Sequence, residues 1–326
     1  MERPVRQLLA LPIVLALSLA SSSAVQCGSR AAVRLDAELD LLVVVDVPKT
    51  LRREVKEVLS DVLAEAPYDH RTVALAELEE GFLATHRVAR AVALGSDACQ
   101  RLAPSGVPTL CALLSAEAFA AVACGAHCER LRAIVMDQPV SRQIAVASSI
   151  YPSLVRFGVL GRERPTDKAR LPPHLSLDYH AFSAAVALPA QLDGALAGND
   201  ALVALPDSTI FNRETLHVVL LTAYGYAKPV IGFSRAYVRA GALISTYATP
   251  EQVLRDVFED VAVERAGQGL EGSGARDEPR WFEDERMRPS TRFSVAENRR
   301  IARSLGLSRR VPIEPGQDYR DENFPL

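Results

Sequence analysis

The stretch from residue 195 to 247 constrains the fold most, because apolar runs there alternate with polar tips. The apolar run 201–205 ends abruptly at a proline, a helical pattern of leucines and valines follows, and a second apolar run covers 230–233. Strand, polar tip, helix and strand in this order form the repeating unit of a doubly wound parallel sheet. Such sheets bind ligands outside the carboxyl ends of their strands, which predicts a small-molecule site at this tip. The tip residues are Asp207, Ser208 and Thr209.

The first half of the chain shows the same alternation. Residues 39–47 (LDLLVVVDV) form a nearly continuous apolar run, typical of a strand buried on both faces of a parallel sheet. Apolar residues at helical spacing follow over 51–62. Together they predict a first α/β lobe. Its further predicted strands cover 72–78, 89–94, 107–114 and 131–136.

A break at Asp137-Gln138-Pro139 separates this series from a second one. A helix is predicted over 141–151. Strands are then predicted at 157–160, 183–187, 201–205, 230–233 and 241–244. The predicted fold is therefore α/β, with two doubly wound parallel-sheet lobes joined by a hinge.

The same patterns predict the domain boundaries. We assign residues 33–136 and 245–326 to lobe 1, the latter as closing elements, and residues 137–244 to lobe 2. Residues 267–289 are rich in glycine and charged side chains with little apolar periodicity, which predicts a flexible insertion. The segments expected to cross between the lobes lie near 137–139 and 233–247.

The amino-terminal segment 1–24 has two arginines, an apolar core too short to span a bilayer, and small residues at its end. This pattern predicts a secretory signal peptide and a periplasmic mature chain. Cys27 raises the alternative of a lipoprotein anchor, but Gln26 stands where the acylation motif needs a small residue. No other stretch is long and apolar enough to cross a membrane, so no integral membrane segment is expected in the mature chain.

Composition and motif content exclude several classes of function. The formal net charge is −3 and the chain has no polybasic run, so a nucleic-acid partner is not expected. The sequence lacks G-x-S-x-G, Walker A and H-E-x-x-H motifs, no G-x-G-x-x-G follows a predicted strand, and its six histidines are scattered. Nothing assembles a nucleophile, a base and an orienting group, so the chain is predicted not to be an enzyme and to need no cofactor.

The five cysteines leave alternatives open. Export permits disulfides, so the segment Cys124–Cys128 fits a closed disulfide loop or a pair of free buried thiols. With His127 it would also form half of a metal site. Zinc takes about four ligands and no second Cys/His pair is present, so no metal is predicted. The remaining cysteines are Cys27, Cys99 and Cys111.

Two polar tips carry the predicted ligand contacts. Gly95 allows a tight turn, Ser96 offers a hydroxyl, and the helix that follows points its amino terminus at this position, which suits a ligand carboxylate. Asp207 would pair with a ligand ammonium, while its neighbours add hydrogen bonds. The alternative at both tips is a helix cap or turn. Further candidates after other strands are Asp46, Ser115 and Ser234.

Five segments together resemble the ABC-transporter substrate-binding proteins of the tryptophan-binding, TrpX-like kind. The segments are Gly95-Ser96-Asp97-Ala98, 136–160, 200–212, 228–247 and 293–307. The resemblance implies a type I periplasmic-binding-protein fold. It also implies a periplasmic protein that captures a small molecule by cleft closure and delivers it to an ABC permease.

An amino acid is the expected ligand class, because the two tips complement an ammonium and a carboxylate. The alternative function is a periplasmic sensor or interaction module, in which the bound ligand signals to a receptor instead of being transported. The sequence does not identify the ligand.

Overall fold

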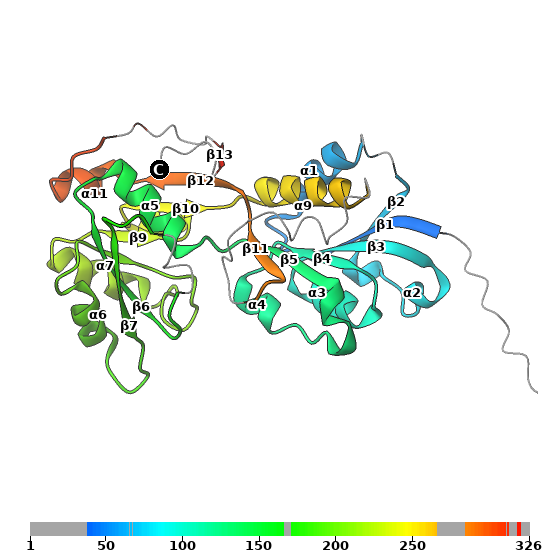
Figure 1. Ribbon diagram of the computed structural model, residues 1–326, viewed down its shortest axis with the longest axis horizontal. Coiled ribbons are helices and arrows are strands. Elements are labelled where there is room, and N and C mark those ends of the chain that lie inside the picture. Colours follow the sequence, from blue (N-terminus) through cyan, green and yellow to red (C-terminus); the bar gives the residue numbers. More distant parts are fainter. Residues whose placement is uncertain are drawn as a thin grey trace, which may run out of the picture. The chain divides into compact units, whose positions relative to one another are not determined.

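The computed structural model describes residues 38–64, 66, 68–165, 171–265, 284–310, 312 and 318–320. The predicted signal peptide, Cys27 and most of the predicted insertion lie outside these residues. Helices and strands alternate along the chain and gather around two sheets (Figure 1). In the described ranges, no helix combines the length and the apolar character that crossing a bilayer requires.

The first sheet has the strand order β11-β5-β4-β3-β1-β2, and all its strand pairs are parallel. Its central strand β1 is buried on both faces: Leu42 and Val44 enter one core, and Leu41 and Val43 enter the other. This explains the continuous apolar run in the sequence. The strands are β1 (Glu38–Val45), β2 (His70–Ala74), β3 (Arg87–Leu94), β4 (Thr109–Ala112), β5 (Leu131–Val135) and β11 (Met287–Pro289).

Helices cover both faces of the first sheet. The helices α1 (Arg52–Ala64) and α9 (Pro250–Arg265) pack together over one face, with Leu59 and Val257 in the shared core. On the other face lie α2 (Phe82–Thr85), α3 (Ser96–Leu102) and α4 (Ala116–Ala120). Short 3-10 turns cover Leu75–Glu77, Ala103–Ser105 and Gly125–Arg130.

The second sheet has the order β13-β12-β10-β9-β8-β6-β7. The strand β12 is antiparallel to β10 and β13, and the other pairs are parallel. Its strands are β6 (Arg156–Gly161), β7 (Ser176–Ala181), β8 (Ala201–Val203), β9 (Val230–Gly232), β10 (Ile244–Tyr247), β12 (Arg292–Glu297) and β13 (Asp318–Arg320). The helices α5 (Val140–Ile150) and α11 (Arg299–Ser304) pack on one face. The other face carries α6 (Leu188–Leu196), α7 (Leu216–Gly225) and α8 (Arg235–Ala240).

We call the first sheet with its helices lobe 1 and the second sheet with its helices lobe 2. The assignment of 245–326 to lobe 1 needs correction, because α9 and β11 are the only helix and strand of that range that pack there among the described residues. The strand β12 pairs with β10, and its Phe293 and Val295 are buried in the lobe 2 core. The chain therefore crosses between the sheets after β5, between β10 and α9, and between β11 and β12. Residues 233–247 hold α8 and β10 of lobe 2, so no crossing lies within them.

One predicted strand was misplaced. Residues 183–187 form a turn with Val186 47% exposed, and the strand is β7, just before them. As an edge strand β7 buries alternate residues, Leu177 and then Tyr179 in part, so it lacks a continuous apolar run. The predicted strand 241–244 instead begins at Ile244, after Gly241 ends α8. Inside the predicted insertion, residues 287–289 form β11 and pair with β5.

Four cysteines form two disulfides within lobe 1. Cys124 is bonded to Cys128, which selects the closed-loop interpretation and leaves no thiolate beside His127 for a metal. The bond between Cys99 and Cys111 joins α3 to β4 in the buried core, and both of these residues are 0% exposed. No spacing motif in the sequence indicated this second pairing.

Candidate ligand-binding site

In each lobe, the strands that follow one another in the sequence are added to the sheet first on one side of a strand and then on its other side. In lobe 1, β1 lies between β2 and β3, and in lobe 2, β6 lies between β7 and β8. Open parallel sheets bind ligands in the crevice outside the carboxyl ends of strands at such a switch point. Asp46 and Gly95 follow β1 and β3, while Arg162 and Asp207 follow β6 and β8. Polar tips predicted from the sequence thus lie at both switch points.

Gly95 brings the strand ends of lobe 1 together. Its φ is +106°, and a Cβ atom at this position would lie 1.8 Å from the carbonyl oxygen of Asp46. The amide of Gly95 donates to the carbonyl of Ala112 at 2.9 Å, and the amide of Asp46 donates to that of Leu94 at 2.8 Å. The tight turn predicted for Gly95 is confirmed. The next residue, Ser96, is exposed at the start of α3, and its ligand contact stays a prediction.

Two of the weaker candidates are helix caps. The hydroxyl oxygen of Ser115 accepts from the amide of Ala118 at 3.1 Å, and that of Ser234 accepts from the amide of Tyr237 at 3.3 Å. Each cap satisfies an amide in the first turn of its helix. The hydroxyl hydrogens remain able to donate to another group.

Asp207 is already engaged in an ion pair. Its Oδ2 accepts from Nε of Arg162 at 2.8 Å, and its Oδ1 accepts from the amide of Thr209 at 2.9 Å. The Asp207 side chain is only 12% exposed, whereas the side chain of Arg162 is 46% exposed. The carboxylate that was predicted to bind an ammonium therefore orients a cation. Ser208 and Thr209 are exposed beside it.

Arg162 is the lobe 2 residue that sequence reasoning missed. Besides Asp207, its guanidinium donates to Oε1 of Glu117 in α4 of lobe 1 at 2.9 Å. The hydrogen bond to Asp207 raises the pKa of this guanidinium, with Glu117 contributing further, so the group stays charged. In the sequence, Arg162 begins a polar stretch with several prolines, residues 162–173, which gives no sign of a binding role. Its position one residue after β6, at a switch point, was the available signal.

Asp137 was also missed, because the sequence indicated only a break at this position. It follows β5, and its Oδ2 accepts from the amide of Ala116 at 2.7 Å. Surrounding protein atoms raise its pKa from the ordinary value of 3.8 to about 6, and the nearby charge of Glu117 adds to this. Asp137 forms no ion pair with any residue that the structure describes. A carboxyl group with a raised pKa at a strand end is typical of a functional site.

We expect Asp137→Asn to stabilise the protein at high pH. Folding raises the pKa of Asp137, so the native state loses stability as pH rises from about 4 through 6, where the charged form becomes dominant. Asparagine keeps an oxygen acceptor for the amide of Ala116 and carries no charge. At pH 8 the variant should exceed the wild type by about 1 to 3 kcal/mol in unfolding free energy.

Urea unfolding of both proteins at pH 8 and pH 4 tests this expectation. The stability difference between them should shrink towards zero at pH 4, where Asp137 is protonated in the native state. A difference that does not change with pH would contradict the raised pKa.

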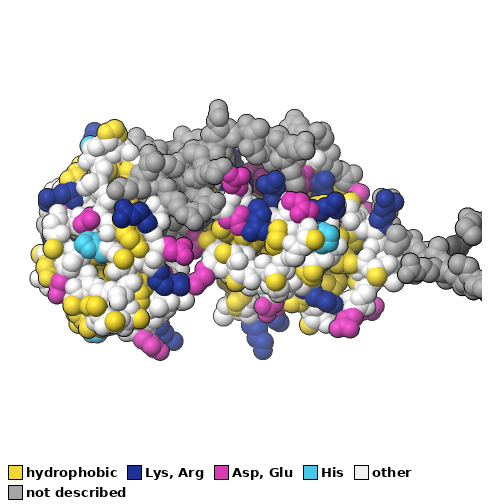
Figure 2. Space-filling model, turned by 60° about the horizontal axis from the view of Figure 1, so that its bottom comes forward, with side chains coloured by type: hydrophobic (Ala, Val, Ile, Leu, Met, Phe, Trp, Pro, Cys, Tyr) yellow, Lys and Arg dark blue, Asp and Glu magenta, His cyan; other side chains and the backbone are white. Residues whose placement is uncertain are grey.

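Figure 2 shows no large field of one charge on the face that it presents. On the face shown in Figure 2, acidic and basic side chains are interspersed with apolar ones. The formal net charge of −3 is correspondingly small.

No protein-family model matches the sequence, and no curated protein matches it. Among solved structures, the chain is similar to the ligand-free, open structure of a substrate-binding protein with adhesive properties from Clostridium difficile. The TM-score is 0.57 at 12% identity, and the match covers 87% of this chain and 97% of that one. The fold is that of a type I periplasmic binding protein. The fold implied by the sequence resemblance is confirmed.

Two further solved structures are similar to this type I periplasmic-binding-protein fold. An ABC domain in complex with L-Trp from Streptococcus pneumonia matches with a TM-score of 0.46 and 15% identity, over 82% of this chain and 96% of that one. An ABC-transporter periplasmic solute-binding protein from Actinobacillus succinogenes, with bound D-allose, has a TM-score of 0.36 and 13% identity, over 72% and 92%. Both TM-scores are below 0.5, so these two structures assign no property to this chain.

Proposed function

We propose that this chain is an exported solute-binding protein that captures a small molecule by closure of its two lobes and presents it to an ABC importer in the periplasm. The observation that carries the proposal is the presence of a switch point with polar tips in each lobe of a type I periplasmic-binding-protein fold. A ligand that contacts both lobes favours the closed state over the open one. The proposal includes no catalytic step.

The ligand class that fits best is an amino acid or a similar zwitterion. Arg162 has a half-exposed guanidinium held in place by Asp207, which suits a ligand carboxylate. Asp137, with its raised pKa and no described cation beside it, suits an ammonium group. The exposed Ser96 hydroxyl and the Asp46 carboxylate offer further hydrogen bonds. This assignment moves the expected ammonium partner from Asp207 to Asp137.

Thermal-shift screening of the purified chain tests the proposed function. The library should contain amino acids, sugars and aromatic carboxylates. A ligand that binds only the folded state at about a hundredfold excess over its Kd stabilises it by about 2.7 kcal/mol. We expect at least one amino acid to raise the melting temperature. A folded protein that no member of the library stabilises would contradict the proposal.

Arg162→Gln is expected to weaken binding of that ligand by about thirtyfold or more. The variant removes the charge-assisted hydrogen bonds that Arg162 would donate to a ligand carboxylate, and it leaves Asp207 and Glu117 without their shared cation. Calorimetric titration measures the loss.

Arg156→Gln is the matched control, because Arg156 makes a comparable ion pair with Asp200, at 3.0 Å, at the opposite end of the same strand. The control should bind within about twofold of the wild type. Equal affinities for all three proteins would remove Arg162 from the proposed site.

A further inference from the structure

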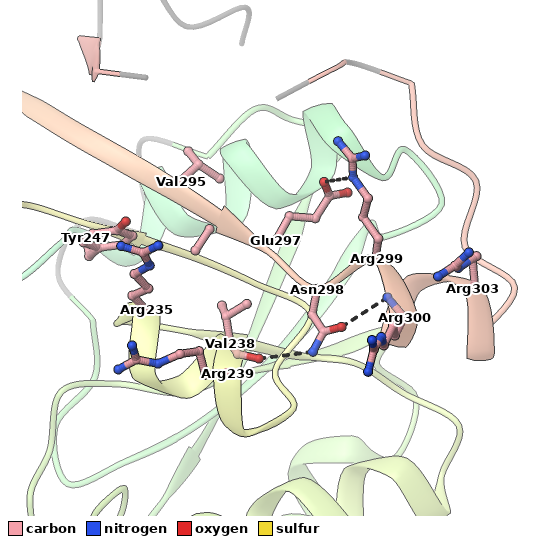
Figure 3. Close-up of a pocket in the computed structure, with 11 residues that line it drawn as sticks. Arg235, Val238, Arg239, Tyr247, Val295, Glu297, Asn298, Arg299, Arg300 and Arg303 are labelled. Carbon is pink, nitrogen blue, oxygen red and sulfur yellow. Dashed lines mark hydrogen bonds and ion pairs between the residues drawn. The ribbon is translucent and has the colours of Figure 1, made fainter. Parts of the chain in front are cut away.

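A second concave site lies in lobe 2, where α8 and α11 flank the end of β12. The pocket has a volume of about 720 Å³, within the usual range for small-molecule sites. Figure 3 shows that its cationic side chains come from both helices, with Asn298 between them. These cations are Arg235 and Arg239 from α8 and Arg299, Arg300 and Arg303 from α11.

The positive charge in this pocket is largely uncompensated. Among the residues that the structure describes, only Arg299 of the five has an ion-pair partner, Glu297 at 3.3 Å. Glu297 is only 7% exposed and also accepts from the hydroxyl of Tyr151. The carboxylate of Glu297 thus points into the lobe and is already engaged by other protein groups. The pocket therefore has five guanidinium groups and one carboxylate, although the whole chain has a net charge of −3. This local excess of positive charge attracts anions.

The helices that carry these arginines are fixed to each other. The side chain of Asn298 donates from Nδ2 to the carbonyl of Val238 in α8 at 3.1 Å. Its Oδ1 accepts from the amides of Arg300 and Ile301 and so caps α11. Val238 and Ala302 are buried beneath the pocket. The two helices are therefore joined through Asn298, while the guanidinium groups that they carry are exposed.

We propose that this pocket binds an anion with two or more phosphoryl groups. Guanidinium groups donate forked, charge-assisted hydrogen bonds that match phosphate oxygens, and one phosphoryl group accepts from more than one of them. A ligand with a single carboxylate would use only one or two of the five guanidinium groups, which favours a ligand with more negative charge. The site goes beyond the proposed solute capture, because none of Asp46, Gly95, Asp137, Arg162 and Asp207 lines it.

Calorimetric titration of the purified chain with inorganic pyrophosphate, at about 50 mM salt, tests the proposal. We expect saturable binding that weakens as ionic strength rises. Each charge-assisted hydrogen bond contributes about tenfold or more in affinity, so the double variant Arg239→Gln/Arg300→Gln should bind at least about a hundredfold more weakly. The lost side chains are exposed, so the melting temperature should change little.

The charge-matched control is Arg53→Gln/Arg213→Gln, which removes two exposed arginines that lie outside the pocket. It should bind pyrophosphate within about twofold of the wild type. Arg162→Gln should also keep pyrophosphate binding, which separates this site from the proposed capture site. Equal weakening in the pocket variant and the charge-matched control would overturn the proposal.

The same phosphate chemistry has two sources, a free polyphosphate or the headgroups of a phospholipid surface. Co-sedimentation with vesicles of phosphatidylglycerol, compared with phosphatidylcholine, distinguishes them. Pyrophosphate binding without vesicle binding supports a free ligand. Vesicle binding that the pocket variant loses and the control keeps supports the headgroup source. Absence of both overturns the proposal.

Discussion

Replacing Gly95 with alanine is expected to lower the free energy of unfolding by about 4 kcal/mol or more. The added Cβ would lie 1.8 Å from the carbonyl oxygen of Asp46, which is backbone and has no rotamer to adopt. Removing this clash would require β1 and β3 to move apart. Their neighbouring residues are fully buried in the sheet, so such a movement would disrupt the core. The left-handed φ of +106° adds further strain for any residue with a side chain. Denaturant unfolding measures the loss.

Gly81→Ala separates the two causes. Gly81 has a φ of +87°, and nothing lies within 4 Å of the position of an added Cβ. It should therefore show only the cost of the left-handed backbone, about 1 to 2 kcal/mol. Similar losses for the two variants would mean that the contact with Asp46 relaxes easily. Gly95 lies at the lobe 1 switch point. A large loss of unfolding free energy in Gly95→Ala would show that this glycine has a structural role there, whether or not it contacts a ligand.

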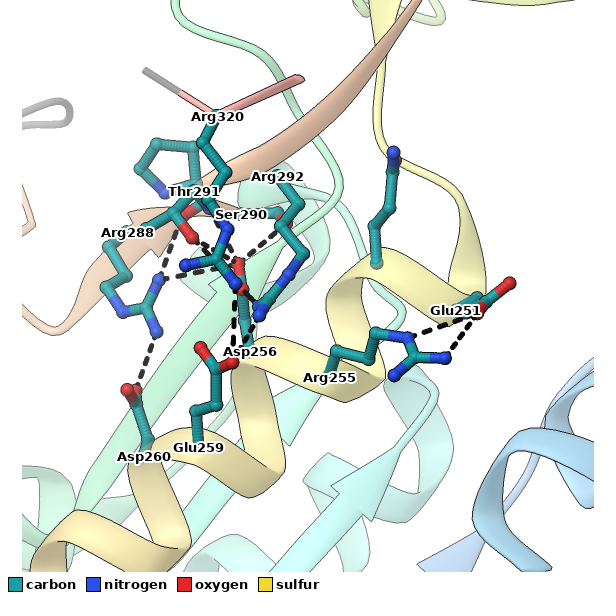
Figure 4. Close-up of polar contacts among 12 residues, drawn as sticks. Glu251, Arg255, Asp256, Glu259, Asp260, Arg288, Ser290, Thr291, Arg292 and Arg320 are labelled. Atoms are coloured by element: carbon teal, nitrogen blue, oxygen red, sulfur yellow. Dashed lines mark hydrogen bonds and ion pairs between the residues drawn. The ribbon is translucent and has the colours of Figure 1, made fainter. Parts of the chain in front are cut away.

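Asp256→Ala is expected to lower the unfolding free energy by about 3 to 5 kcal/mol, since it leaves the buried cation of Arg292 to the half-exposed Glu259 and removes the acceptor of Ser290 and Thr291. Asp256 lies on α9 and is 1% exposed, and it pairs with Arg292, whose side chain is 8% exposed. Its carboxylate also accepts from the hydroxyl of Ser290 at 2.7 Å and from the amide of Thr291 at 2.6 Å (Figure 4). These contacts fasten the crossing between β11 and β12 to a helix of lobe 1.

The matched control lies on the same helix. Glu251 pairs with Arg255 at 2.8 Å, but both side chains are about half exposed, so Glu251→Ala should cost about 0.3 to 0.5 kcal/mol. A double variant, Asp256→Ala/Arg292→Met, removes the stranded charge and should recover part of the loss. A small loss in Asp256→Ala, comparable to the control, would show that Glu259 or solvent compensates the charge of Arg292 in its place.

The crossings are also joined to one another. Arg142 of α5, just after the first crossing, donates to the carbonyl of Ser290 at 2.9 Å and to the side chain of Gln138 at 2.7 Å. Buried, charge-assisted hydrogen bonds of this kind fix backbone positions that apolar packing leaves free. Variants at Asp256 are therefore expected to affect the segments about which the lobes would move.

Local sequence determined much of this fold. Central strands buried on both faces need apolar residues at successive positions, so β1, β3, β6 and β9 are visible as continuous runs. The polar residues directly after them identified the carboxyl ends of the strands. Gly95 was predicted to form a tight turn for the right reason, since only glycine tolerates that backbone and that approach.

The tertiary structure alone decided what pairs across distance. Edge strands such as β7 and β11 are only half-buried, so their apolar patterns are weak. No local pattern indicated that β12 returns to the sheet of lobe 2. The Cys99–Cys111 disulfide and the ion pair of Arg162 with Asp207 join residues whose proximity depends on strand order. Strand order is set by how helices cover the sheets, which is a property of the whole chain. The sequence therefore located the polar tips, and only the folded chain determined that Asp207 faces a cation while no described cation pairs with Asp137.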